Sequence, residues 1–150
     1  IDRCCVSRLD RADLRFQTGQ EIYTAVAAVD RDAGQIHLTG RELLGTWEEN
    51  AAGFRQGQTV TGTIRSIMPY GVFVELAPNL SGLAETTLPV AVNDTVSIYI
   101  RAIQPDRHKV KLNILEILPR ANPQPMTYFL TEGRLEKWEY YPGSNVVTYF

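Results

Sequence analysis

Apolar and polar residues alternate with a period of two along the middle of the chain. Apolar side chains occupy the even positions of segments 96–102 and 110–114, with mostly polar residues between them. Upstream, segments 60–67 and 70–76 have the composition of two strands joined at Met68-Pro69. Such alternation is typical of strands with one buried face, and five short strands at this spacing predict a small closed β-barrel in a mainly all-β chain.

An internal repeat is visible at a constant offset of 74 positions. Gly19–Asp30 corresponds to Asn93–Gln104, and Gln35–Leu38 corresponds to Lys109–Leu112. Apolar residues match apolar residues at six positions: Ile22/Val96, Val26/Ile100, Ala28/Ala102, Val29/Ile103, Ile36/Val110 and Leu38/Leu112. Both copies therefore predict a strand, a polar turn and a second strand.

The segments around these copies predict a helix and a β extension. Thr46 and Glu49 form a capping-box pattern, with Thr46 as N-cap of a short helix that ends near residues 50–52. Three prolines between positions 119 and 125 interrupt regular structure. Three strands are predicted beyond them: 127–131, 134–140 and 145–150.

Composition restricts the classes of function. Fifteen basic and seventeen acidic residues give a net charge of −2, which argues against bulk electrostatic capture of duplex DNA. The isolated His37 and His108 form no catalytic constellation, and the adjacent Cys4 and Cys5 lack metal-ligand spacing. We expect reduced thiols and a non-enzymatic protein without cofactor, metal or small-molecule substrate. No apolar run approaches the ~20 residues that span a bilayer, so we expect a cytoplasmic protein without membrane contact.

The central segment closely resembles the S1-type domain of the ribosomal protein S1 family. The resemblance covers Gly57–Leu76, then Leu80–Leu83, then residues 93–116, and includes the aromatic-Gly-x-Phe-Val motif at 70–74. It implies a five-stranded OB barrel that binds single-stranded RNA, messenger RNA in particular, as part of a tandem-repeat protein in translation. The small ribosomal subunit is a further candidate partner.

The resemblance also implies a domain organisation. It predicts the C-terminal part of a preceding S1-type repeat at 1–45, a helical linker at 46–53, a complete S1-type OB domain at 54–116, and a proline-rich connection with a β extension at 117–150. The first copy starts after its aromatic strand. Because a half barrel leaves strand edges and an apolar face uncovered, we expect strands in 127–150 to pack against residues 1–45.

Alternation indicates which aromatic residues could contact RNA. Val72, Val74 and Leu76 take the core side of their strand, which places Phe73 on the outer face beside Gly71. Phe73 is therefore a candidate platform for base stacking, and a ring covered by another segment is the alternative. Tyr70 resembles the first stacking aromatic of the family, with a packing role in the turn as its alternative.

Basic residues gather near the last predicted turn, where OB folds take their ligands. The candidate RNA-binding side chains beside the two rings are Arg65, Arg101, Arg107, His108, Lys109 and Lys111. An ordinary solvated strand face is the alternative. Two positions depart from the family pattern, because Glu85 replaces a usual histidine and Gln104 replaces a usual acidic residue. A carboxylate near phosphate is repulsive, so weaker affinity or a shifted ligand path is expected.

Three functions remain open from the sequence. The first is sequence-tolerant binding of single-stranded RNA in translation. The second is a module that contacts the ribosome or proteins with weak or no RNA binding, favoured by the acidic balance and Glu85. The third is an accessory domain of an RNA-processing enzyme such as a polynucleotide phosphorylase.

Overall fold

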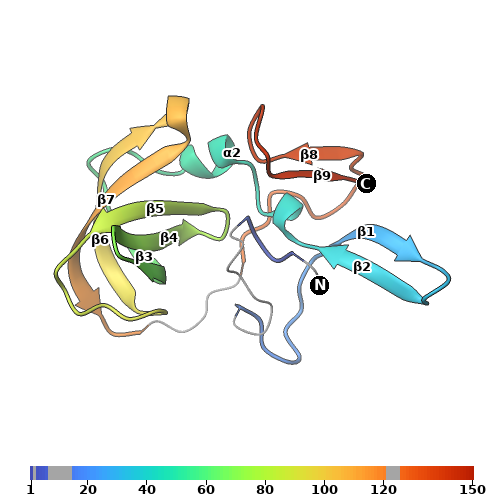
Figure 1. Cartoon of the computed structure of the whole chain (residues 1–150), viewed down its shortest axis with the longest axis horizontal. Helices are drawn as coiled ribbons and strands as arrows, with labels where there is room; N and C mark the ends of the chain where they lie inside the picture. Colours follow the sequence, from blue (N-terminus) through green and yellow to red (C-terminus); the bar gives the residue numbers. More distant parts are fainter. Residues whose placement is uncertain (2, 7–14, 121–125) are drawn as a thin grey trace. The chain divides into compact units, whose positions relative to one another are not determined.

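A computed structural model describes residues 1, 3–6, 15–120 and 126–150, which form two compact units (Figure 1). One unit combines Ile1–Thr46 with Met126–Phe150, and the other contains Trp47–Pro125. The predicted proline-rich connection lies partly outside the described residues, at 121–125. Among the residues that are described, no helix is long and apolar enough to span a membrane.

The second unit is a closed barrel of five strands, which confirms the predicted OB-type fold (Figure 1). The strands are β3 (Thr59–Met68), β4 (Gly71–Ala77), β5 (Leu80–Glu85), β6 (Thr95–Gln104) and β7 (Lys109–Leu118). They pair in the order β3-β4-β5-β7-β6, with β5 and β7 parallel and every other pair antiparallel. The helix α2 (Trp47–Ala51) precedes the barrel, and the 3-10 turn η2 (Pro105–Arg107) joins β6 to β7.

The barrel core follows the period of two. Ten inward positions on the five strands are at most 3% exposed: Ile64, Val72, Val74, Leu80, Ala84, Val96, Ile98, Ile100, Val110 and Leu112. Gly82 also faces inward, because a Cβ atom there would lie 2.6 Å from Leu112 Cδ1 and 3.0 Å from the Val110 carbonyl oxygen. The close approach of β5 to β7 therefore depends on the missing side chain.

The first unit contains two separate two-stranded sheets. One pairs β1 (Ala25–Asp30) with β2 (Gln35–Thr39), and the other pairs β8 (Lys137–Glu139) with β9 (Val147–Tyr149). The 3-10 turn η1 (Arg41–Leu43) follows β2. The expectation that the C-terminal segment packs against residues 1–45 is confirmed, since both belong to this unit.

The predicted strand at 127–131 is wrong, and the other strands of this unit are shorter than predicted. Residues 127–131 are irregular because the N–H groups of Phe129 and Leu130 both donate to the carbonyl oxygen of Leu43, at 2.8 and 3.4 Å, instead of to a strand ladder. Residues 19–24 likewise precede β1 without joining a strand.

A buried carboxylate connects the two segments of the first unit. Glu42 is 1% exposed and accepts hydrogen bonds from the hydroxyls of Thr39 (2.7 Å) and Thr148 (2.6 Å). Arg41 Nε lies 3.4 Å from Glu42 Oε1, and Arg41 Nη2 donates to the Val147 carbonyl oxygen at 3.1 Å. Burial lowers the pKa of Arg41, and the charge of Arg3 lowers it further, while Glu42 opposes both effects. Because both of its oxygens accept hydrogen bonds, the buried Glu42 carboxylate holds β9 against η1.

Gly82→Val should destabilise the barrel by about 1–3 kcal/mol, because the new side chain overlaps Leu112 in a filled core. The free energy of opening at the Ile100 amide, measured by hydrogen exchange, checks this. Ser81→Val is the matched control, since Ser81 is the exposed neighbour on the same strand. Equal stability of the two variants would contradict the packing argument.

Glu42→Ala should destabilise the first unit by about 3 kcal/mol, because it removes the buried counter-charge of Arg41 and the carboxylate to which the Thr39 and Thr148 hydroxyls donate. Hydrogen exchange at the Thr148 amide measures the loss, and the Ile100 amide of the barrel should not change. Glu132→Ala, at an exposed position of the same unit, is the control. A protected Thr148 amide in Glu42→Ala would rule out this role for the carboxylate.

Candidate nucleic-acid interface

Two aromatic rings lie close together at the turn between β3 and β4 and at the start of β4. Gly71 has φ +153°, and a Cβ atom there would lie 2.8 Å from the Ala84 carbonyl oxygen, so a side chain would push β4 away from β5. Next to it, Tyr70 is 61% exposed, and Phe73 is half-buried on β4. Their rings are perpendicular, with centroids 6.3 Å apart. In this arrangement the Tyr70 ring is largely exposed, and the two rings make an edge-to-face contact.

Residue pairing between neighbouring strands connects Phe73 on β4 to a basic residue on β7. Phe73 pairs with Ser66 on β3 and with Leu83 on β5, and Leu83 pairs with Lys111 on β7. Neighbouring strands lie about 4.8 Å apart, so Phe73 and Lys111 are separated by roughly 10 Å. We call Phe73, Leu83 and Lys111 the outer row. It combines an aromatic ring, an apolar side chain and an ammonium group on one face.

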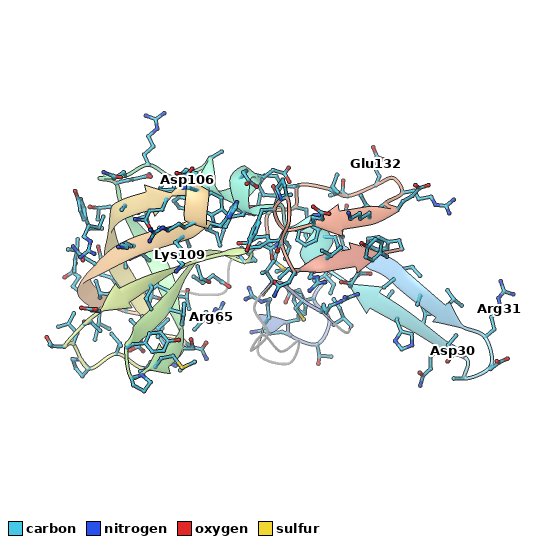
Figure 2. All side chains as sticks on the ribbon, turned by 45° about the horizontal axis from the view of Figure 1, so that its top comes forward. Asp30, Arg31, Arg65, Asp106, Lys109 and Glu132 are labelled. Atoms are coloured by element: carbon cyan, nitrogen blue, oxygen red, sulfur yellow. The ribbon has the colours of Figure 1, made fainter. Side chains whose placement is uncertain are left out.

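The basic residues of β6 and β7 continue from the end of the outer row. Arg101, Arg107, Lys109 and Lys111 are all exposed. Arg101 lies at the bulge of β6 beside the Ala102–Lys111 pair, and Lys109 pairs with Gln104 at the start of β7. Figure 2 shows Lys109 on the same hairpin as Asp106. The structure thus brings four of the six predicted basic residues to this hairpin as exposed side chains.

His108 also lies in this hairpin, but helix α2 holds it. Its backbone is left-handed, with φ 53° and ψ 47°. The ring meets the edge of Trp47 at 5.2 Å between centroids, and Nε2 lies 3.2 Å from Oε1 of Glu48. A carboxylate therefore occupies the position where a phosphate could approach this imidazole.

Arg65 is engaged elsewhere. Its guanidinium donates to Glu75 Oε2 at 3.0 Å and to Asn93 Oδ1 at 3.1 Å, and it lies in the bulge of β3 beside β4. These contacts pair it with an acidic neighbour and do not bring it into the basic hairpin.

The two departures from the family pattern border the same face. Glu85 is exposed at the end of β5, where it pairs with Asn113 on β7. Gln104 pairs with Lys109, and its Oε1 atom is buried without a hydrogen-bond partner among the described residues. An unsatisfied buried acceptor is costly, so a donor from a ligand would be favourable there.

Sequence reasoning missed Leu83, Asn113 and Glu48. Leu83 and Asn113 could have been found, because each alternates with inward neighbours on a strand and so faces outward. Glu48 could not, since only tertiary folding brings α2 to His108, 60 positions away.

We compared the chain with known proteins, and several ribosomal proteins are similar to it. No family model matches the sequence. The small ribosomal subunit protein bS1 of Chlamydia muridarum is 26% identical over 129 residues, which are 78% of this chain and 23% of that protein. The bS1 protein of Staphylococcus epidermidis is 28% identical over 79% of this chain and 33% of that protein, and the bS1 homolog of Bacillus subtilis is 26% identical over 83% and 36%. The chain spans about a quarter to a third of the length of these relatives.

One similar protein has an enzyme name. The 4-hydroxy-3-methylbut-2-enyl diphosphate reductase of Fusobacterium nucleatum is 28% identical over 77% of this chain but only 15% of that protein. The alignments with several bS1 proteins cover most of this chain at a similar identity. The barrel also has the strand order and the aromatic strand described above. The chain is therefore related to the ribosomal protein S1 family.

Proposed function

We propose that residues 54–116 bind single-stranded RNA across the outer face of β4, β5 and β7. The observation that carries this proposal is the outer row, which sets the Phe73 ring in register with Leu83 and Lys111. Aromatic rings stack on any base, and exposed ammonium and guanidinium groups attract the phosphates between bases. Such a surface favours binding that tolerates many sequences.

The charges of the module favour modest affinity that depends on salt. Four exposed cations lie on the β6–β7 hairpin, while Glu85 borders the outer row and the whole chain carries −2. Each phosphate contact releases counterions, so affinity falls as salt concentration rises.

The biological setting that we propose is translation in the cytoplasm. The relatives named small ribosomal subunit protein bS1 support it, with messenger RNA as ligand and the small ribosomal subunit as partner. A module that contacts proteins is the second candidate. Arg65 and His108 each already contact a carboxylate, and the acidic Glu85 is exposed.

Phe73→Ala should weaken binding of a short unstructured RNA by about 1–3 kcal/mol, the contribution of one stacked base. Fluorescence anisotropy titrations at several salt concentrations measure the dissociation constant. Tyr149→Ala removes an aromatic ring that is 72% exposed on the first unit and should bind like the unmodified chain. Absence of saturable binding even at low salt would contradict the RNA-binding proposal and favour the protein-contact function.

Glu48→Gln should strengthen RNA binding by up to about fivefold, because it removes a carboxylate that competes with phosphate for His108, and a surface contact of this kind contributes about 0–1 kcal/mol. The same anisotropy titration measures the change. Glu116→Gln removes an identical charge from an exposed position farther along β7 and serves as control. Equal gains in both variants would mean that only net charge matters.

A further inference from the structure

The β1–β2 hairpin repeats the geometry of the β6–β7 hairpin, pair for pair. Adding 74 to each residue number converts every pair of the first hairpin into a pair of the second. Three examples are Ala25↔Thr39 with Tyr99↔Asn113, Val26↔Leu38 with Ile100↔Leu112, and Ala28↔His37 with Ala102↔Lys111. A bulge lies at the same place in both, between Val26 and Ala28 and between Ile100 and Ala102. The first hairpin thus has the form of the last two strands of such a barrel.

A parallel contact at the edge of β2 extends the correspondence. Arg3 forms a parallel bridge with Thr39, and its carbonyl oxygen accepts a hydrogen bond from the Gly40 N–H at 2.7 Å. In the complete barrel the residue equivalent to Thr39 is Asn113, which pairs in parallel with Glu85 at the end of β5. Arg3 therefore stands where the third strand of a barrel ends.

Equivalent side chains differ sharply in burial between the two hairpins. Val26 is 55% exposed and its counterpart Ile100 is fully buried, while Ile36 is 64% exposed and its counterpart Val110 is only 3% exposed. Val29 is also exposed. The C-terminal segment belongs to the same unit but leaves these apolar side chains open to solvent. Such a face on a two-stranded sheet indicates an interaction surface.

A groove lies beside the edge of β1. Its volume is about 560 Å³, and it is lined by Thr24, Ala25 and Val26 together with residues of the C-terminal segment. In the complete barrel, the counterparts of Thr24 and Ala25 pair with β3, at Val60 and Thr59. The groove thus borders the residues to which a first strand would bind.

We propose that the β1–β2 hairpin is a docking surface for a three-stranded β-meander of the β3–β5 type. Its first strand pairs with the edge of β1, and its third strand runs parallel to β2 and ends at Arg3. Its inward apolar side chains cover Val26, Val29 and Ile36. The tip that carries Asp30 and Arg31 stays in solvent (Figure 2).

This occupant follows from continuity with a contact that already exists. The Arg3–Thr39 bridge begins the parallel pairing at the β2 edge, and a third strand would continue it toward Gln35. A second copy of the hairpin could cover the apolar face but would bring no parallel strand to that edge. A meander pairs both edges and covers the face at once, as β3, β4 and β5 do in the complete barrel.

The test extends the full chain with its own meander. A copy of residues 55–82 is joined directly ahead of Ile1, so that Arg3 takes the position of Glu85 in the third strand, and hydrogen exchange is followed at the Val26 amide. The counterpart amide, Ile100 N–H, donates to the Gln58 carbonyl oxygen at 2.9 Å. Exchange at Val26 should therefore slow on the order of 100-fold in the extended chain. The matched control carries Ile64→Asp and Val74→Asp in the added copy only.

Equal exchange at Val26 in the extended chain and in the control, with the Ile100 amide protected in both, would overturn the proposal. Sedimentation of the unextended chain tests the other occupant. If that chain dimerises, and Val26→Asp abolishes both the dimer and the protection of Val26, a second copy covers the face and the meander does not. A monomeric unextended chain with protection only in the extended one is the expected result. None of these outcomes depends on RNA binding.

Discussion

The second unit depends on closure of its sheet through the parallel pairing of β5 with β7. Only three residue pairs make this contact, yet without it β5 and β7 would both expose unpaired edges. Closure requires β5 to approach β7 closely, and Gly82 permits this approach because no side chain separates the backbone from Leu112 and Val110. The remaining inward positions then fill the interior with aliphatic side chains, most of them branched.

The same pairing creates the candidate RNA surface. Because β5 lies between β4 and β7, the residue opposite Phe73 is also the residue opposite Lys111. An aromatic ring and a cation from segments nearly forty residues apart thus share a face without any dedicated loop. A register change of one residue on β5 would turn Leu83 inward and break the row, so stability and binding constrain the same register.

The sequence predicted those features that depend on local alternation. The barrel strands, the outward direction of Phe73 and the start of α2 after Thr46 all follow from patterns within a few residues. The irregular segment at 127–131 did not, because its apolar and aromatic composition suits a strand while the Leu43 carbonyl oxygen takes its N–H groups. The pairing of His108 with Glu48 and the burial of Glu42 against Thr148 also arise only from tertiary contacts.

Comparison of the two hairpins shows which features local sequence determines and which features require other strands to cover the apolar face. Both have the same register and the same bulge, although the inward face of the β6–β7 hairpin is buried and the β1–β2 hairpin leaves Val26 and Ile36 in solvent. Turn chemistry and backbone pairing are therefore sufficient to specify the hairpin geometry, whereas a stable core requires strands from outside the hairpin. In the first unit, the buried Glu42 network attaches the C-terminal segment next to the hairpin and leaves its apolar face free. The unit thus keeps a preformed surface whose shape already matches a β-meander, so docking would require little reordering of the backbone.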